Sequence, residues 1–391
     1  NKLNVPHLRF PEFHGEWEKC KLGDIAEFST ARVSSVKLDC KNYVSTENML
    51  QDFQGVVEAK SVPNETNVIS FTCGDILISN IRPYLKKVWK ATFDGGCSSD
   101  VFVLQATDTV AKDYLHYAVA NDKFINYVMS GAKGVKMPRG DKNQMRTYQL
   151  SLPSIQEQYK IAKLLTLLDE RIATQSKLIE KLESLIKGLN DTLYAQYGDE
   201  VMTSFAELGT SYSGLSGKSA HDFGSGKPFI TYLNVYSNNV INENDFQYVA
   251  IKDGEKQNVV EYGDVLFTLS SETPEEVGIG SVYLGKEKVY LNSFCFGIHI
   301  TNTKVAFPPY LSYYVSSTAF RKFIYPYAQG STRFNLCKAD FEKASIKLPT
   351  LENQKRIYSI LSHIDNKIET ERKTLELYNS QKQYLLRQMF I

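Results

Sequence analysis

At 391 residues the chain is longer than one ordinary domain and fits two or three domains. No apolar run approaches the roughly 18–20 residues of a membrane-spanning helix, so we expect no membrane span. The 45 basic and 44 acidic side chains leave a formal charge of +1, which argues against indiscriminate polyanion binding but allows a local basic face.

The cysteines are scattered along the chain and form no C-x-x-C pair. Structural zinc requires clustered ligands, and no histidine stands at ligand spacing, so we expect no metal site. Isolated thiols are typical of reduced cytosolic proteins, which predicts a cytoplasmic location. The six positions are Cys20, Cys40, Cys73, Cys97, Cys295 and Cys337.

Residues 1–152, hereafter the first module, carry short β-rich runs separated by Gly, Asn and Ser clusters. Strands are expected at Val68–Phe71, Asp75–Ser79 and Val101–Leu104, followed by one helical stretch over Lys112–Met129. A glycine-containing loop and a last strand follow. This order predicts a compact α+β domain.

Residues 153–197 predict a long central helix. Apolar side chains recur in alternating steps of four and three, the heptad spacing of a coiled coil, with Gln175 as the polar exception. Pro153 is tolerated at the first turn and ends the preceding strand. At ~1.5 Å per residue, forty residues make a rod of about 60 Å, and its apolar seam needs a partner helix. The expected seam residues are Ile161, Leu165, Leu168, Ile172, Ile179 and Leu182.

Residues 198–348, the second module, repeat the order of the first. Strands are expected at Val265–Leu269 and Cys295–Ile300, and a helical stretch over Pro309–Tyr325. The fold class is therefore α+β, with two tandem, similar α/β domains separated by long helices.

Residues 349–391 predict a second coiled-coil helix after Pro349. Glu371, which aligns with Gln175, and Lys382 interrupt its seam. The simplest pairing with the central helix is antiparallel, because a module must return the chain between them. An amphipathic helix packed on an ordinary core is the alternative. The seam residues are Ile357, Leu361, Ile364, Ile368 and Leu375.

The chain contains an internal repeat that covers nearly its whole length. Leu152-Pro153-Ser154-Ile155 returns 196 residues later as Leu348-Pro349-Thr350-Leu351, and the same offset continues to the C-terminus. With small gaps, Gly74-Asp75-Ile76-Leu77 matches Gly263-Asp264-Val265-Leu266. The protein is a duplicated unit of module plus helix.

The sequence carries no recognisable catalytic motif. Gly217-Lys218-Ser219 looks like the end of a phosphate loop, but Tyr212 stands where the required glycine should be. No histidine lies near a Gly-x-Ser-x-Gly elbow or an H-E-x-x-H helix. We therefore expect a chain that is not itself an enzyme.

Basic segments without acidic residues recur in both modules, between residues 76–93 and 123–140 in the first and 304–339 in the second. Lys and Arg neutralise phosphates, whereas Arg, Asn and Gln can read base edges in the major groove. A solvated basic face is the alternative for any single segment, but recurrence favours a polyanion surface. The candidate DNA-binding residues are Asn80, Arg82, Tyr84, Lys86, Lys133, Lys136, Arg139 and Lys142 in the first module, and Gln329, Ser331, Thr332, Arg333, Asn335 and Lys338 in the second.

The two modules differ in one loop. The first has Ser79-Asn80-Ile81-Arg82-Pro83-Tyr84 where the second has the acidic Ser270-Ser271-Glu272-Thr273-Pro274-Glu275-Glu276. If both loops face DNA, the two modules must read different sites, since a carboxylate accepts from cytosine but repels phosphate. Alternatively, the acidic loop points away.

With these residues in view, the chain resembles the specificity subunit of type I restriction–modification systems, over essentially its whole length. The tandem Leu-Pro-x-Ile/Leu-x-x-Gln-x-x-Ile segments, each leading to Leu-x-x-x-Asp-x-x-Ile, are the most specific part of the resemblance. The other matching residues are Leu8-Arg9-Phe10-Pro11-Glu12-Phe13, Gly15-Glu16-Trp17, Leu22-Gly23-Asp24-Ile25 and the two Gly-Asp-Ile/Val-Leu elements.

The resemblance implies two target recognition domains that each bind one half of a split site on double-stranded DNA. It implies two modification subunits as partners, which carry S-adenosylmethionine and methylate adenine, and optionally restriction subunits that use ATP with Mg. No cofactor is expected in this chain. Two other interpretations remain: a scaffold of two binding modules on a coiled coil without DNA, and a specificity chain that associates with a type II-like enzyme.

Overall fold

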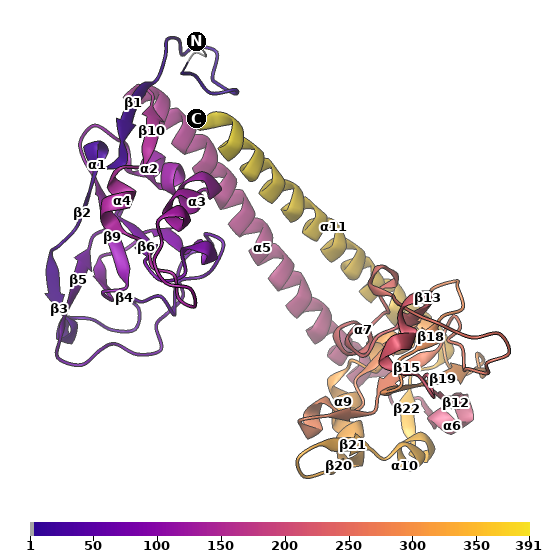
Figure 1. Ribbon diagram of the computed structural model, residues 1–391. Helices are drawn as coiled ribbons and strands as arrows, with labels where there is room; N and C mark the ends of the chain where they lie inside the picture. The colour runs from indigo at the N-terminus through magenta and orange to yellow at the C-terminus, as the bar shows by residue number, and fades with distance from the viewer. Residues whose placement is uncertain (1–3) are drawn as a thin grey trace. The chain divides into compact units, whose positions relative to one another are not determined.

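The computed structural model describes residues 4–391 and contains two compact units (Figure 1). One unit comprises Asn1–Ser176 with Lys373–Ile391, and the other comprises Lys177–Arg372. Each unit therefore holds one module and one half of each long helix. No helix in residues 4–391 is both long and apolar enough to span a membrane.

The first module contains two four-stranded sheets. One has the strand order β2-β9-β6-β7 and is antiparallel throughout; the other has the order β3-β5-β8-β4, with β4 parallel to β8. A separate pair, β1 and β10, brings the start and the end of the module together. The strands are β1 Glu18–Lys21, β2 Ala26–Phe28, β3 Arg32–Ser34, β4 Tyr43–Val44, β5 Asn67–Phe71, β6 Ile76–Ser79, β7 Val88–Lys90, β8 Gly95–Cys97, β9 Val101–Ala106 and β10 Gln149–Leu152.

The central strand β6 is buried on both faces, which explains its continuous apolar run. Successive side chains of a strand point to opposite faces. Ile76 and Ile78 accordingly join the core that packs on the helices, whereas Leu77 joins the core between the two sheets. The helices of the module are α1 Leu22–Ile25, α2 Lys112–Val119, α3 Asp122–Ser130 and α4 Lys142–Arg146.

The second module repeats the first sheet strand for strand, in the order β12-β19-β15-β17. Its further strands form the sheets β14-β13-β18 and β16-β21-β20 and the pair β11 and β22. The strands are β11 Val201–Thr203, β12 Gly209–Ser213, β13 Phe223–Ile230, β14 Gln247–Val249, β15 Val265–Thr268, β16 Ser270–Ser271, β17 Gly280–Val282, β18 Tyr290–Leu291, β19 Cys295–Ile300, β20 Ala328–Gly330, β21 Phe334–Leu336 and β22 Ile346–Leu348. The helices are α6 Phe205–Leu208, α7 Tyr232–Ser237, α8 Pro308–Tyr314, α9 Thr318–Ile324 and α10 Lys338–Lys343.

The prediction of one helical stretch per module was wrong, because each stretch is divided into two helices. The side chain of Asn121 accepts a hydrogen bond from the N–H of Phe124 at 3.1 Å and starts α3. Ser317 caps α9 in the same way, by accepting from the N–H of Phe320 at 3.1 Å. The predicted loop before the last strand also contains a short helix in each copy, α4 and α10.

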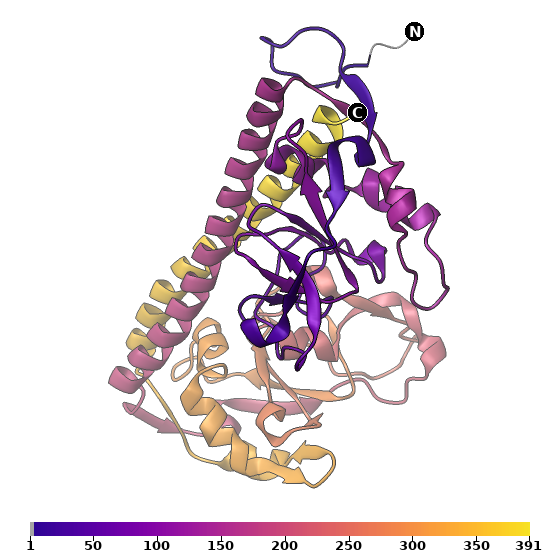
Figure 2. The same cartoon turned by 90° about the vertical axis from the view of Figure 1, so that its left-hand side faces the viewer.

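The long helices are α5 Ile155–Tyr197 and α11 Leu351–Met389, and they run side by side (Figures 1 and 2). In the first unit Lys382 forms an ion pair with Asp169 at 2.6 Å, and in the second Arg372 forms one with Glu183 at 2.5 Å. Residue numbers thus rise along one helix while they fall along the other, and the pairing is antiparallel. The predicted fold class is confirmed.

The predicted seam lies along this pairing. Its buried members are Ile161, Leu165, Leu168, Ile179, Ile357, Leu361 and Ile368, and its half-buried members are Ile172, Leu182, Ile364 and Leu375. The two polar interruptions of α11 have partners: Glu371 forms an ion pair with Lys367, and Lys382 lies near the Tyr117 ring besides its ion pair with Asp169.

Each module is fastened to the helix that follows it by two residues of the repeated motif. Gln158 accepts from the N–H of Ala111 at 2.9 Å, and Gln354 accepts from the N–H of Phe307 at 2.7 Å. Asp169 accepts from the hydroxyl of Tyr117 at 2.8 Å, and Asp365 accepts from the hydroxyl of Tyr313. The Gln and Asp of the motif therefore dock module on helix.

Candidate nucleic-acid interface

In the first module, two loops far apart in sequence meet beyond the end of β6. The N–H of Arg82 donates to the carbonyl of Pro138 at 2.8 Å, and the N–H of Gly140 donates to the carbonyl of Asn80 at 3.0 Å. Ile81 pairs with Arg139 as an antiparallel bridge. The loop after β6 and the loop between α3 and α4 thus form one surface.

The second of these loops is a small hairpin, Lys133–Arg139, hereafter the first hairpin. Its end residues exchange both main-chain hydrogen bonds, at 3.1 and 2.9 Å. Gly134 has a φ of +97°, and a Cβ there would lie 3.1 Å from the carbonyl oxygen of Met137. Glycine is therefore required at this turn.

The second module contains the equivalent hairpin, Gln329–Asn335, hereafter the second hairpin. Gln329 pairs with Asn335 across β20 and β21, and Asn335 also pairs with Ser270 in β16. The corresponding glycine, Gly330, again has a positive φ of +147°. Both hairpins start and end at the same repeat positions, 196 residues apart, and pair with the loop after the same strand.

The two hairpins share a backbone frame but carry different side chains. Six positions of the repeat differ between the hairpins. The first hairpin has Lys133, Val135, Lys136, Met137, Pro138 and Arg139 where the second has Gln329, Ser331, Thr332, Arg333, Phe334 and Asn335, in the same order. Only the glycine is kept. A constant frame with variable side chains is the arrangement expected of a surface that reads different targets in its two copies.

Among the first-module candidates, Arg82, Lys133 and Lys136 are exposed, and the Tyr84 ring is 48% exposed. Arg139 is exposed but forms an ion pair with Asp100 at 2.9 Å.

Two other candidates of this module have partners of their own. Lys86 is half-buried and forms an ion pair with Asp122 at 2.9 Å. Lys142 lies over the ring of Phe102 at 4.7 Å. The ion pair of Lys86 and the ring contact of Lys142 make these two the less available cations. Asn80 is half-buried, and its side-chain oxygen has no hydrogen-bond partner among the described residues.

In the second module, the hairpin candidates Gln329, Ser331, Thr332 and Asn335 are all exposed. Arg333 is exposed as well, and its Nε and one Nη donate to the hydroxyl of Ser270 at 3.3 and 3.1 Å. This contact fixes the direction of the guanidinium group.

Lys338 corresponds to Lys142 and repeats its contact. Its ammonium lies over the Phe296 ring at 4.9 Å and 3.6 Å from Glu342. The structure thus brings the hairpin and loop candidates of each module together, and it places Lys142 and Lys338 at the first turns of α4 and α10.

Sequence reasoning missed a third segment beside the surface of the first module. The N–H of Asp52 donates to the carbonyl of Leu85 at 3.1 Å, and that of Phe53 to the carbonyl of Lys86 at 2.9 Å. Asp52, Phe53, Arg82 and Lys86 all have positive φ, and they are four of the five such non-glycine residues in the described chain. Backbone strain of this kind, about 1–3 kcal/mol per residue, clusters at functional sites.

In the second module, α7 follows the equivalent strand. The hydroxyl of Tyr232 donates to the carbonyl of Ser270 at 2.9 Å. The sequence carries a shared pattern here, Ser45-x-x-Asn48 in the first module and Thr231-x-x-Asn234 in the second. Both asparagines are buried, and their side chains donate hydrogen bonds to main-chain carbonyls nearby.

The acidic loop is attached to the second module rather than free. Glu276 accepts from the hydroxyls of Tyr236 and Ser271, each at 2.9 Å, and the Tyr236 contact lowers the pKa of this carboxyl. Arg321 donates to the main-chain carbonyls of Glu275, Val277 and Gly278. One carboxylate of the loop is therefore used internally, while the side chains of Glu272 and Glu275 are exposed.

Lys218, in the segment that resembles a phosphate loop, has a structural contact. Its side chain is 6% exposed, and its ammonium donates to Glu255 at 2.7 Å and to the carbonyl of Ala250 at 2.6 Å. The hydrogen bond from Lys218, together with those from the N–H of Lys252 and the side-chain amide of Gln257, lowers the pKa of Glu255 to about 2. The lysine therefore holds two loops together and is not available to a phosphate.

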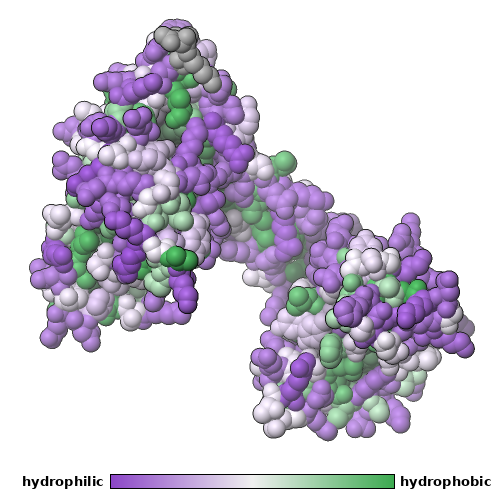
Figure 3. Space-filling view, in the orientation of Figure 1, coloured by the Kyte–Doolittle hydropathy of each residue, from purple (hydrophilic) through white to green (hydrophobic). Residues whose placement is uncertain are grey.

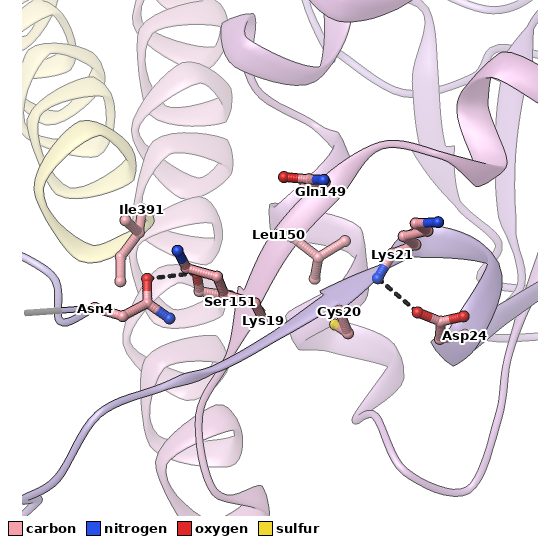
Figure 4. Close-up of a pocket in the computed structure, with 9 residues that line it drawn as sticks. All are labelled: Asn4, Lys19, Cys20, Lys21, Asp24, Gln149, Leu150, Ser151 and Ile391. Atoms are coloured by element: carbon pink, nitrogen blue, oxygen red, sulfur yellow. Dashed lines mark hydrogen bonds between the residues drawn. The ribbon is translucent and has the colours of Figure 1, made fainter.

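A cavity of about 420 Å³ lies beside β1 and β10 in the first unit (Figure 4). Burial raises the pKa of its one thiol, Cys20, to about 11, so this group is protonated at neutral pH and a poor nucleophile.

In the part of the chain that the structure describes, no group of three His, Cys, Asp or Glu side chains is arranged for a metal ion. Hydrophilic residues cover most of the face of each unit seen in Figure 3.

Comparison with known proteins agrees with this architecture. The chain is 24% identical to the type I restriction enzyme MjaVIII specificity subunit of Methanocaldococcus jannaschii, over 96% of this chain and 94% of that protein. It is 22% identical to the EcoDI specificity subunit of Escherichia coli, over 48% of this chain and 42% of that protein. The S subunit of a type I system from M. genitalium has the same fold, with a TM-score of 0.58, 15% identity and 99% of both chains covered.

The model of the type I restriction modification DNA specificity domain matches the chain twice, at residues 14–184 and 213–377. These matches follow the internal repeat and include both hairpins. The chain therefore belongs to the family of type I restriction–modification specificity subunits.

Proposed function

We propose that this chain reads a split site on double-stranded DNA and directs partner subunits to methylate adenine within it. The two target recognition domains would be residues 1–152 and 198–348, and the coiled-coil helices 153–197 and 349–391 would join them. Each domain would contact one half-site. The observation that carries the proposal is the pair of hairpins with one backbone frame and different, exposed side chains.

The charge on the surface supports contact with DNA. Lys133 and Lys136 of the first hairpin are exposed, and Arg82 is exposed on the adjoining loop. These cations suit phosphates, whereas Gln329, Arg333 and Asn335 of the second hairpin can donate to base edges. The first module would therefore rely more on charge, and the second on hydrogen bonds.

Catalysis would belong to the partners. We propose two modification subunits that bind S-adenosylmethionine, and optionally restriction subunits that use ATP with Mg. The chain itself would hold no cofactor and would act in the cytoplasm, in keeping with its free cysteines.

The test is to sequence the methylated bases in cells that contain the modification partner, with and without this chain. We expect a methylated motif of two defined half-sites and an undefined spacer, and we expect it to disappear without the chain. Binding of the assembled complex to a duplex with this motif should weaken steeply as salt rises, because counterions compete for the phosphates. An unchanged methylation pattern, or affinity independent of salt, would point to a scaffold instead.

A further inference from the structure

The first hairpin carries an apolar side chain that is fully exposed. Val135 is 101% exposed, the highest value for a large apolar residue in the described chain, and Met137 beside it is 45% exposed. The flanking cations Lys133 and Lys136 are exposed as well. A hydrophobic group at the tip of a basic loop therefore faces solvent without contributing to the core.

The backbone presents this valine in a defined position. The paired main-chain hydrogen bonds between Lys133 and Arg139 close the hairpin, and Gly134 fixes the turn with a φ of +97°. Valine is stiff because branching at Cβ restricts χ1. Little conformational entropy is lost when such a side chain is covered by a partner.

A DNA duplex offers an apolar partner of one kind on its base edges. Phosphate groups are charged hydrogen-bond acceptors, whereas in the major groove the 5-methyl group of thymine is the apolar feature, which apolar side chains contact. We propose, on the basis of the DNA-reading function above, that Val135 reads a thymine methyl group in the half-site of the first module.

The second hairpin has different chemistry at the same positions. Ser331 replaces Val135, and Arg333, held by Ser270, replaces Met137. A hydroxyl group donates and accepts hydrogen bonds, and a guanidinium group donates them. Neither group binds more tightly to a base because that base carries a methyl group. Ser331 is therefore not expected to take the role of Val135 in the half-site of the second module.

The experiment uses the full chain with its modification subunits and duplexes that carry the methylated motif. Each thymine is replaced in turn by uracil, which pairs identically but lacks the methyl group. At one position of one half-site, uracil should weaken binding about three- to five-fold, the effect of burying one methyl group. The Val135→Ser variant should bind the thymine and uracil duplexes equally well.

Val36→Ser is the matched control, because Val36 is also exposed, at 74%, but lies away from both hairpins in sequence. This variant should keep the preference for thymine. The inference is overturned if no uracil substitution weakens binding, or if Val135→Ser retains the methyl preference. Either result would leave site-specific binding of the wild-type complex intact, whereas loss of that binding would contradict the proposed function itself.

Discussion

Arg333 shows how a single residue can be placed for recognition before any target arrives. Two of its guanidinium nitrogens contact the hydroxyl of Ser270, whose carbonyl in turn accepts from Tyr232. This chain of contacts reduces the side-chain entropy lost on binding. The remaining donors of the guanidinium are those available to a base.

We expect Arg333→Ala to weaken specific DNA binding by about 1–3 kcal/mol if the residue pairs with a guanine, and to relax selectivity at one base pair. Competition binding with duplexes altered at each position measures both effects. Lys304→Ala, which removes another exposed cation of the second module, is the control. A variant that methylates the same motif with the same selectivity would remove Arg333 from the site.

Gln354 is a second residue whose role can be measured alone. Its side chain is fully buried, accepts from the N–H of Phe307 and donates to the carbonyls of Val305 and Pro349. Gln354→Ala leaves these buried groups without a partner and should lower the free energy of unfolding by about 1–3 kcal/mol. Denaturant unfolding checks this, with the exposed Gln381→Ala as the control. Equal stability of the two variants would contradict the docking role.

The contact of Glu255 with Lys218 predicts a dependence on acid. The pKa of this carboxyl falls from its ordinary 4.5 to about 2, so its contribution to stability is present above about pH 4.5 and lost as pH falls towards 2. The wild type should therefore exceed Glu255→Gln in stability near neutral pH, and the two should converge on acidification. Thermal unfolding across this range provides the measurement, and a constant difference would rule out the ionised contact.

At the scale of elements, the heptad spacing and the repeat were enough to predict two long paired helices. The helical stretches of the modules were harder, because the apolar pattern continues across Asn121 and Ser317 while their side chains cap a new helix. The surface was predicted as a set of basic residues, but main-chain hydrogen bonds between distant loops bring these residues together. Pairing of that kind leaves no mark on composition or spacing, and neither do the positive φ angles of Asp52 and Phe53.

The helix pair contains an asymmetry that can be tested. Lys382 faces Asp169 in the first unit, whereas the repeat places Ile186 at the equivalent position of α5. Lys382→Ile should destabilise the first unit by about 1 kcal/mol, because Asp169 loses its cation at a half-exposed site. Adding Asp169→Asn should recover part of the loss. A double-mutant cycle measures the coupling, and purely additive effects would show that the pair contributes nothing.

At the scale of the whole molecule, each module is docked on a different half of the helix pair. Inserting one heptad into both helices, after Ser176 and after Arg372, keeps the apolar seam in register. It lengthens each helix by about 10 Å, which corresponds to up to roughly three base pairs. We expect a longer spacer between unchanged half-sites in the methylated motif. A motif with the original spacer would exclude the helices as the element that sets the spacing.

The docking of each module on its own helix has an evolutionary consequence. Because the Gln and Asp contacts lie within one repeat, a genetic crossover in the repeated helix sequence transfers a recognition surface together with its anchoring residues. Exchange of such a unit, one module with its anchoring residues, between related genes would produce a protein that recognises a new pair of half-sites. The exchanged module would still dock on its helix, because the Gln and Asp that hold it there are transferred together with it.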